Sequence, residues 1–363
     1  MSGQTKIIFN EGYVASAAAS RSYAGPRRFA PGLASKLIGW GTSGDGSVDG
    51  LTPDELLGLL ARLRQARVGD VRVPHKPLLL LWLFGRFATT GSSLATYAEA
   101  EEPVSHLINE FGPPVKSPSA ARSRAAMPFV HLERELWDLR DGQGREIGTD
   151  APERGGWLTG REAAGRLRPE VEQLLSSRGM LAAAARLLLD RHFTPLLADL
   201  ICADVDLDLA SLNAAAPVDA ARIRRRARRS GFAEEVLRAY AYQCAMCGFD
   251  GALGRTPVGI EAAHVRWHSQ DGPDDVANGL ALCALHHVLL DLGVLGLTAD
   301  RRICVSGLYV ARNDAGKAVD ALAGQPLLAA RPGQPAVDIS YVSWHNVQVF
   351  KGSHEPSPWG AGR

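Results

Sequence analysis

The chain has 363 residues, enough for two or three domains that each bury a core of their own. A composition of 46% hydrophobic and 22% charged residues is ordinary for globular proteins and excludes collagen-like, fully disordered and disulfide-scaffold classes. The formal net charge of +1 neither predicts nor excludes a nucleic-acid partner. No aliphatic run approaches the roughly 20 residues of a membrane span and no secretory signal is visible, so we expect a cytoplasmic protein without a membrane partner.

The first helices can be placed from caps and apolar spacing. Residues 1–50 are rich in Gly, Ala and Ser and lack apolar periodicity, which predicts a flexible N-terminal extension. Order is expected to begin at Thr52, which precedes Pro53 and forms a capping box with Glu55. Further helices are predicted over residues 77–87 and 104–111, the second ending at Gly112.

The middle of the chain mixes strand and helix signals. Apolar residues alternate loosely over 128–139 and a turn follows at 141–144, which predicts a β-hairpin. Turn-forming composition further along the chain, after residue 205, indicates a linker at 206–218. We therefore expect an α+β multidomain chain whose first domain, residues 51–205, is mainly α with a small β-hairpin or sheet. Helical patterns are predicted at 163–177, 181–193 and 195–203.

The five cysteines point to metal rather than to disulfides, because their number is odd and the expected compartment is reducing. Cys244 and Cys247 form a Cys-x-x-Cys pair, and Cys283 and His286 form a Cys-x-x-His pair. Together they supply the Cys3His ligand set of tetrahedral zinc. Four protein ligands leave no open position, so we expect a structural zinc ion that staples two short segments together.

Three residues around the second pair follow the order His264, Asn278, His287. This order resembles the HNH family of endonucleases, whose ββα-metal fold places the first His on a strand, the Asn in a loop and the last His on a helix. Matching segments here are a strand at 258–264, a loop at 272–279 and a helix at 284–292.

The HNH resemblance implies a role for each of these residues. His264 would activate water, for which a neutral imidazole near pH 7 is suited, and Asn278 would support the loop and orient the base or the metal. His287 would ligate a catalytic Mg²⁺ or Mn²⁺. Many members carry a further metal ligand where this chain has Ala263, and Asn278, Glu261 and Asp291 remain open as substitutes. We favour His268 as a hydrogen-bonded structural histidine over a catalytic role.

An arginine-rich segment precedes the first cysteine pair. Six arginines fall within residues 222–229, on a helix expected to lead into the nuclease. Such a helix can neutralise several phosphates, and we favour Arg224, Arg225 and Arg228 as DNA-backbone contacts over a simply solvated helix face. The nuclease domain, with this helix, is expected to span 219–352, and residues 353–363 to form a C-terminal tail.

A second resemblance covers about residues 51–352. The segments that carry it are Val73–Leu81, Glu110–Pro114, Met127–Phe129, Arg154–Gly156 and Phe350–Gly352. They resemble phosphorothioate-dependent McrA-type restriction endonucleases, type IV enzymes that join an N-terminal sulfur-binding domain to a C-terminal HNH domain. A shallow apolar pocket in that family accepts the sulfur that replaces a phosphate oxygen, and nearby cations hold the remaining charge.

The resemblance implies that Met127 and Pro128 form the apolar wall, with His131 alongside. Relatives usually carry Tyr at the position of Met127. The methionine keeps apolar contact but lacks the ring and hydroxyl of tyrosine. The resemblance also implies polar and cationic contacts from His75, Lys76 and Arg154. Arg122 and Arg124 are candidate phosphate or base-edge contacts, with a solvated loop as the equal alternative.

The combined interpretation is a restriction endonuclease that binds phosphorothioated double-stranded DNA and hydrolyses nearby phosphodiesters. Two alternatives stay open: a zinc-containing DNA-binding protein with weak or no nuclease activity, and an HNH endonuclease that reads methylated cytosine. Because one HNH site nicks one strand, a double-strand break needs two events, which is compatible with a homodimer.

Overall fold

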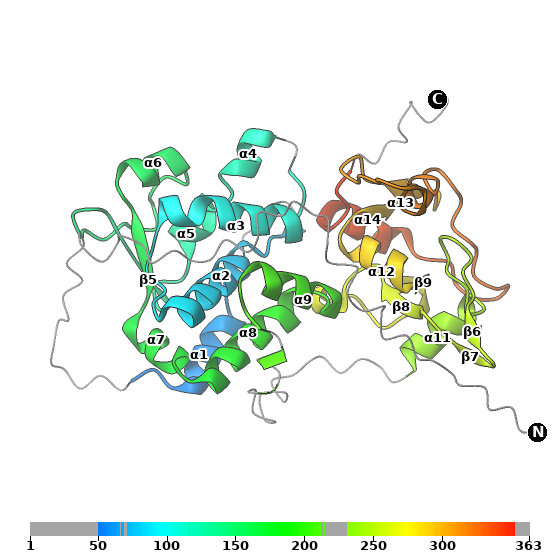
Figure 1. Ribbon diagram of the computed structural model, residues 1–363, viewed down its shortest axis with the longest axis horizontal. Helices are drawn as coiled ribbons and strands as arrows, with labels where there is room; N and C mark the ends of the chain where they lie inside the picture. Colours follow the sequence, from blue (N-terminus) through cyan, green and yellow to red (C-terminus); the bar gives the residue numbers. More distant parts are fainter. Residues whose placement is uncertain are drawn as a thin grey trace, which may run out of the picture.

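The computed structural model describes residues 50–65, 67–68, 71–115, 117–208, 210–211, 214 and 231–352. The predicted extension before residue 50, most of the predicted linker, the contacts at Arg224, Arg225 and Arg228, and the predicted tail lie outside the described residues. The described residues form two lobes that lie side by side (Figure 1). No helix among them has the length and apolar character needed to cross a membrane.

The first lobe is a helical domain around one long buried helix. That helix, α2, is buried from His75 to Arg86 and packs against α3, α5 and α8. Its helices are α1 Pro53–Ala61, α2 His75–Thr90, α3 Tyr97–Phe111, α4 Pro118–Arg122, α5 Ala126–His131, α6 Gly155–Gly160, α7 Pro169–Leu175, α8 Arg178–His192 and α9 Pro195–Asp204. Its strands are β1 Arg67–Val68, β2 Val71–Arg72, β3 Ala95–Thr96, β4 Trp137–Arg140 and β5 Ala164–Leu167.

Several predicted helix ends are confirmed. The capping box between Thr52 and Glu55 starts α1, and Gly112 caps the end of α3. α3 begins earlier than predicted, at Tyr97, behind a second capping box formed by Thr96. Pro103 lies inside this helix, so the proline does not mark its start.

Two predictions in the middle of this lobe are wrong. Residues 126–131 form helix α5, and the expected hairpin is reduced to a single bridge between Arg140 and Glu146. Residues 164–167, expected to be helical, form β5 at the centre of an antiparallel sheet of order β3-β5-β4. Gly165 fits there because a Cβ would lie 1.9 Å from the Trp137 ring. Pairing with distant strands outweighs the local helical pattern.

The second lobe contains the ββα unit that the HNH resemblance implies. β8 pairs antiparallel with β9 in a register that sets His264 opposite Gly279, and α12 follows directly. Its helical elements are α11 Phe232–Ala239, η3 His268–Gln270, η4 Val276–Asn278, α12 Ala284–Asp291, α13 Asp314–Asp320 and α14 Ile339–Gln348. Its strands are β6 Ala252–Leu253, β7 Thr256–Pro257, β8 Ile260–His264, β9 Gly279–Cys283, β10 Leu295–Leu297 and β11 Ile303–Val305.

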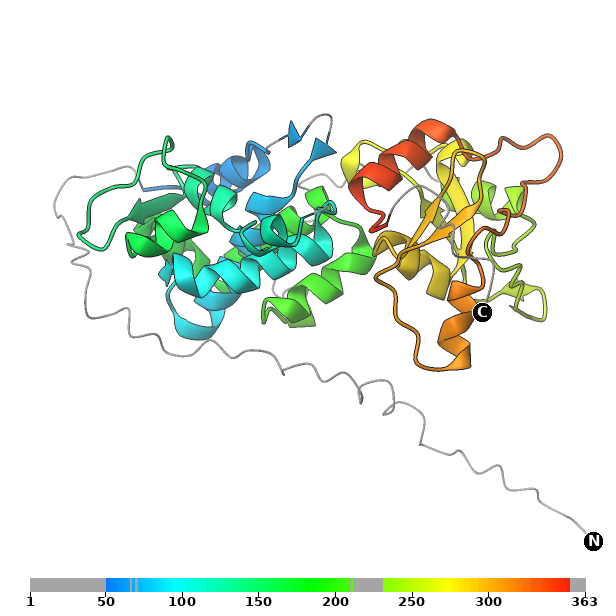
Figure 2. The same ribbon diagram turned by 90° about the horizontal axis from the view of Figure 1, so that it is seen from above.

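The two lobes have separate apolar cores but share a boundary. Trp267 and Val349 belong to the second lobe by sequence, yet their side chains pack into the core of the first. α8 contacts η3, and α9 contacts α12. Seen from above, α14 lies beside the β1–β2 end of the first lobe (Figure 2), in agreement with the contact between α14 and β2. The lobes therefore meet through side chains that lie close to the ββα unit.

Candidate functional site

The four predicted zinc ligands come together at one end of the ββα unit. Cys244 and Cys247 lie on a tight turn after α11, closed by a hydrogen bond from the Gly248 amide to the Cys244 carbonyl at 2.8 Å. Gly248 has φ +73°, a conformation that favours glycine. Cys283 ends β9 and His286 lies in the first turn of α12. The strand-to-helix junction thus delivers the second pair to the first.

The donor set fits zinc. The three Sγ atoms and one imidazole nitrogen lie within 4.8 Å of one another, and His286 Nδ1 is 3.3 Å from the Sγ atoms of both Cys244 and Cys283. Tetrahedral zinc needs such atoms about 3.5 to 3.8 Å apart. Burial raises the pKa of the Cys244 thiol, but hydrogen bonds from His286 and nearby backbone amides outweigh it and hold that pKa at about 6. Cys244 is therefore favoured as a thiolate, the form that binds zinc, whereas burial raises the pKa of the Cys247 and Cys283 thiols.

His264, at the end of β8, contacts an aromatic ring and a carboxylate. Its ring stacks on Phe232 of α11, with centroids 4.2 Å apart, and its Nε2 is 2.8 Å from Asp274 Oδ1. α11 can approach this closely because Gly279 lies opposite His264; a Cβ there would be 2.4 Å from Val236. An Asp274 carboxylate that accepts the Nε2 proton leaves the imidazole lone pair on Nδ1. That arrangement suits a general base.

Asp274 is shared by a second histidine. His268 Nε2 lies 3.9 Å from Asp274 Oδ2, and its ring centroid is 5.8 Å from that of His264. Sequence reasoning missed both Asp274 and Phe232, because neither has a periodic or motif spacing to His264. Only the fold of the loop and the packing of α11 bring them to the site.

Asn278 fastens the loop that carries Asp274. Its Nδ2 donates to the carbonyls of Arg266 at 3.0 Å and Pro273 at 2.9 Å, and its Oδ1 accepts from the Arg266 amide at 2.8 Å. The side chain has no exposed surface. In this position Asn278 ties the two ends of the loop together, which matches the loop support that the resemblance implies.

His287 lies between two carboxylates on the α12 side of the unit. Its Nδ1 is 2.7 Å from Glu261 Oε2, and its Nε2 is 3.8 Å from Asp291 Oδ2. Glu261 is half exposed, whereas Asp291 is buried and accepts hydrogen bonds from Thr194 and Trp267. Of the three substitutes left open for a metal ligand, Glu261 is the one that faces solvent beside His287.

In the first lobe, one hydrogen bond links the helix of the predicted apolar wall to the residue before a predicted cation, Arg154. Met127 and His131 lie four residues apart on α5 and are half-buried, while Pro128 between them is buried. His131 Nε2 lies 2.7 Å from Glu153 Oε1, which joins α5 to the start of α6. The exposed Arg154 caps α6 directly after Glu153.

Three other predicted contacts are turned inward. Lys76 Nζ lies 2.7 Å from Glu133, and Arg124 donates to the carbonyls of Ile108 and Pro113 at the end of α3. Arg124 Nη2 is also 3.0 Å from His75 Nε2. Burial and the nearby Arg124 charge lower the pKa of His75 to about 3, so its imidazole is neutral at pH 7. These buried groups anchor the start of α2, and DNA contact by them stays a prediction.

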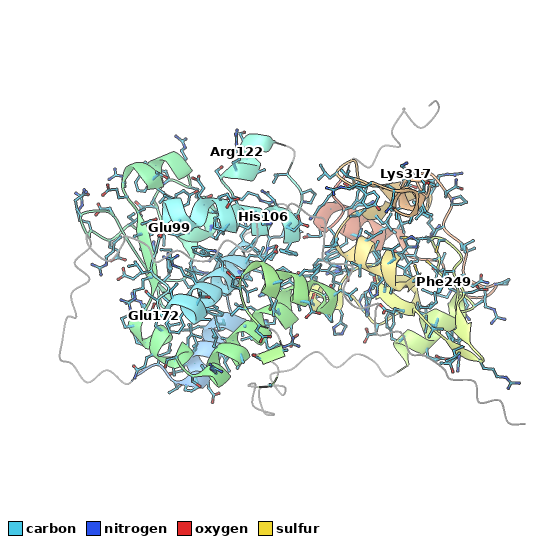
Figure 3. The ribbon with its side chains drawn as sticks, viewed as in Figure 1. Glu99, His106, Arg122, Glu172, Phe249 and Lys317 are labelled. Atoms are coloured by element: carbon cyan, nitrogen blue, oxygen red, sulfur yellow. The ribbon has the colours of Figure 1, made fainter. Side chains whose placement is uncertain are left out.

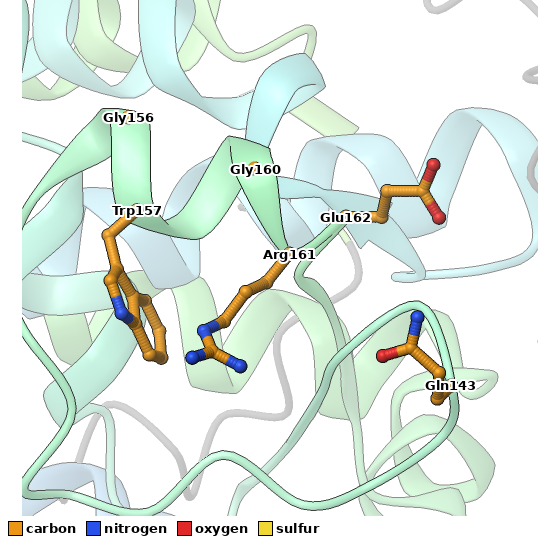
Figure 4. A pocket seen from close by; sticks show the side chains of 6 residues that line it. All are labelled: Gln143, Gly156, Trp157, Gly160, Arg161 and Glu162. Carbon is orange, nitrogen blue, oxygen red and sulfur yellow. The ribbon is translucent and has the colours of Figure 1, made fainter.

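Two further features of the first lobe are exposed. Arg122 at the end of α4 is exposed (Figure 3). A hollow of about 640 Å³ opens beside α6, lined by Trp157, Arg161 and the neighbouring Gln143 and Glu162 (Figure 4). The Arg161 guanidinium lies 4.4 Å from the Trp157 ring centroid. A flat aromatic ring with a cation over it is a surface on which a nucleobase can stack.

Comparison with known proteins assigns both lobes. The family described as ScoMcrA-like, DNA sulfur-binding domain matches residues 53–210, and the HNH endonuclease family matches residues 244–298. A search of the curated proteins finds no match. Both resemblances inferred from the sequence are thus confirmed at the level of domains.

Solved structures show weaker likenesses. The sulfur binding domain of SprMcrA complexed with phosphorothioated DNA is 22% identical, with a TM-score of 0.36, and covers 44% of this chain and 96% of that chain. The corresponding ScoMcrA domain is 24% identical, with a TM-score of 0.34 and coverages of 43% and 96%. The modification dependent TagI restriction endonuclease is 21% identical, with a TM-score of 0.26 and coverages of 34% and 38%.

With TM-scores this low, the domain assignment rests on the two family matches. The sulfur-binding match ends after α9, and the HNH match begins at Cys244, the first zinc-ligand candidate, and includes His264, Asn278 and His287. The chain therefore combines a DNA sulfur-binding domain of the ScoMcrA-like family with an HNH endonuclease domain.

Proposed function

We propose that this protein is a modification-dependent restriction endonuclease that binds phosphorothioated double-stranded DNA and hydrolyses phosphodiester bonds nearby. The observation that carries the proposal is the presence, in one chain, of a DNA sulfur-binding domain and an HNH endonuclease domain. A nuclease attached to a reader of one chemical mark cuts where that mark occurs. Solved sulfur-binding domains of SprMcrA and ScoMcrA were complexed with phosphorothioated DNA, which supports the choice of mark.

In the proposed reader, α5 and the start of α6 form the modified-DNA surface. Met127 and Pro128 offer the apolar contact that favours sulfur over the more strongly hydrated oxygen. The exposed Arg154 follows Glu153, which contacts His131 of α5, and is the proposed cation for the phosphate charge. Arg122 is a further candidate contact on the same lobe.

In the proposed nuclease, His264 is the general base. Asp274 holds the Nε2 proton and Phe232 covers one face of the ring, so that Nδ1 accepts the proton from the attacking water. Asn278 preserves this geometry by fastening the loop on which Asp274 lies. A buried, oriented imidazole of this kind can deprotonate water next to a bound phosphate.

His287 and Glu261 are the proposed ligands of the catalytic cation. Side chains alternate along a strand, so Glu261 and Ala263 project from the same face of β8, where Glu261 contacts His287 of α12. Glu261 therefore offers a carboxylate on the side where Ala263 lacks one. Mg²⁺ or Mn²⁺ at these residues would stabilise charge on the phosphate and the leaving oxygen. Two protein ligands suffice, because Mg²⁺ keeps several waters and also binds substrate phosphate.

The zinc ion is proposed as structural, held by Cys244, Cys247, Cys283 and His286. Among the described residues, this is the only group of three or more metal-ligating side chains whose ligand atoms all lie within 4.8 Å of one another. The substrate places the enzyme in the cytoplasm, and a homodimer remains the proposed route to a double-strand break.

The proposal is tested with duplexes identical except for one Rp phosphorothioate, across several core sequences, in Mg²⁺ or Mn²⁺. We expect selective binding to the sulfur-bearing duplex and metal-dependent cuts near the mark that disappear in His264→Ala. Cutting should also fall in Glu261→Gln, with binding unchanged. Selective binding without cutting would favour the DNA-binding alternative. Equal binding to both duplexes, with selective binding to methylated cytosine, would favour the other alternative.

A further inference from the structure

The turn between α8 and α9 brings the reader domain into contact with the nuclease domain close to the HNH residues. At this turn the His192 carbonyl accepts a hydrogen bond from Gln270 Nε2 at 3.4 Å. Two residues later, Thr194 Oγ1 donates to Asp291 Oδ2 at 2.8 Å. Figure 1 shows α9 at the boundary of the lobes, next to α12. The reader thus contacts both the loop after His264 and the helix that carries His287.

Asp291 is the residue at which these contacts converge. It lies at the end of α12 with only 4% of its surface exposed. Its Oδ1 accepts from Trp267 Nε1 at 3.0 Å, and the Oδ2 that accepts from Thr194 lies 3.8 Å from His287 Nε2. One buried carboxylate therefore joins the reader, the HNH loop and the proposed metal ligand.

Trp267 strengthens the same connection from the other side. It follows His264 by three residues, but its side chain packs into the apolar core of the reader and against the edge of Trp344, at 5.8 Å between centroids. The indole N–H then reaches back to Asp291. The loop after the proposed base is thus held by the reader as well as by residues of the nuclease.

The position of Asp291 bears on how His287 can bind a metal ion. The group that faces the second ring nitrogen of a ligating histidine sets its tautomer and its orientation. In this structure His287 Nδ1 is within hydrogen-bond distance of Glu261, at 2.7 Å, whereas Asp291 Oδ2 lies 3.8 Å from Nε2. A cation that bound Nδ1 beside Glu261 would leave the ring proton on Nε2, the nitrogen that faces Asp291. A charge-assisted hydrogen bond from Thr194 holds Asp291 in this position, and such bonds are about twice as strong as neutral ones.

We propose that Thr194 of the reader domain is a positioning residue for the nuclease, acting through Asp291 on His287. The inference rests on the proposed nuclease function for its effect on cutting, but not for its effect on the structure of α12. In this arrangement the position of α12, the helix that carries His287, depends on its contact with the reader domain.

The test uses the full chain with Thr194→Val, which removes the hydroxyl at nearly constant shape, and Thr194→Ser, which keeps it. Thr298→Val is the matched control, because Thr298 also bonds an aspartate, Asp300, but on the exposed surface. Three quantities are measured: affinity for a phosphorothioated duplex without divalent cation, hydrogen exchange of α12 amides in the metal-free protein, and the Mn²⁺ concentration for half-maximal cutting.

In Thr194→Val we expect unchanged duplex affinity, α12 exchange faster by about tenfold, and an Mn²⁺ requirement raised by about tenfold. Thr194→Ser should restore both values, and Thr298→Val should alter neither. Wild-type exchange and Mn²⁺ dependence in Thr194→Val, or equal defects in the Val and Ser variants, would overturn the proposal.

Two further arms keep the test decisive. If Thr194→Val does not fold, Trp267→Phe removes the indole hydrogen bond to Asp291 together with part of the ring packing in the reader core. Unchanged α12 exchange in that variant would overturn the proposal. If the wild-type chain cuts no modified duplex, the proposed function fails, and α12 exchange alone then decides whether Thr194 positions this helix.

Discussion

The replacement Asn278→Ala tests whether the HNH loop is held from within by one amide side chain. The substitution removes three hydrogen bonds, two to the backbone of Arg266 and one to Pro273. Asn278 is fully buried, so the backbone groups it leaves behind lose their partners inside the protein. At about 1 kcal/mol for each bond, we expect the free energy of unfolding to fall by about 3 kcal/mol.

The chain offers a matched control in the same domain. Asn346 makes one hydrogen bond through Nδ2, to the Leu297 carbonyl at 2.7 Å, and its buried Oδ1 has no partner among the described residues. Asn346→Ala should therefore cost about 1 kcal/mol. Hydrogen exchange of the β8 and β9 amides across a denaturant series measures the opening free energy of the ββα unit in each variant.

One result would refute the role assigned to Asn278. If Asn278→Ala lowers the opening free energy by no more than Asn346→Ala, then the loop is held by other contacts and the assigned role of Asn278 is wrong. A loss near 3 kcal/mol in a variant that still binds phosphorothioated DNA but cuts poorly would support the view that Asn278 acts through the loop bearing Asp274.

Three further predictions concern zinc, sulfur and pH. Cys247→Ser should lower the zinc content measured by atomic absorption and destabilise the nuclease domain, and a fully folded variant without zinc would contradict a structural ion. Pro128→Glu should weaken binding to sulfur-bearing DNA more than to plain DNA in a titration of both, and an equal loss would remove Pro128 from the pocket. The folded-state pKa of His75 is about 3, below its unfolded value, so its contribution to stability is complete above about pH 6.5 and is lost as pH falls toward 3. His75→Gln should therefore reduce the loss of unfolding free energy between pH 7 and pH 5 by about 2 kcal/mol in denaturant titrations, and an unchanged loss would refute a buried neutral imidazole.

The parts of the fold that were predictable are those set by short-range spacing. The capping box at Thr52 and the paired zinc ligands each involve residues three apart, a distance at which sequence spacing translates directly into contact. The order of His264, Asn278 and His287 likewise predicted a strand, a loop and a helix that the structure contains.

The errors came where contacts join distant segments. β5 reads as helix locally, but its pairing with β4, which sets Trp137 opposite Leu167, decides its conformation. The helix α5 was hidden in the same way, because the loose alternation around Pro128 fits a strand as well as a short buried helix. Local pattern cannot rank two structures that differ in their long-range partners.

The same limit explains why the supporting residues of the site were missed while its central residues were found. A histidine in a motif is recognisable by its neighbours in sequence, but the carboxylates and hydroxyls that orient it are chosen by the fold. Thr194 precedes Asp291 by 97 positions, and no periodicity links them. Their contact exists only because α8 ends and α9 begins next to η3 and α12. In a protein that joins a reader to a nuclease, such contacts between domains are where recognition can be connected to catalysis, so the interface, rather than either motif, is the place to look for that connection.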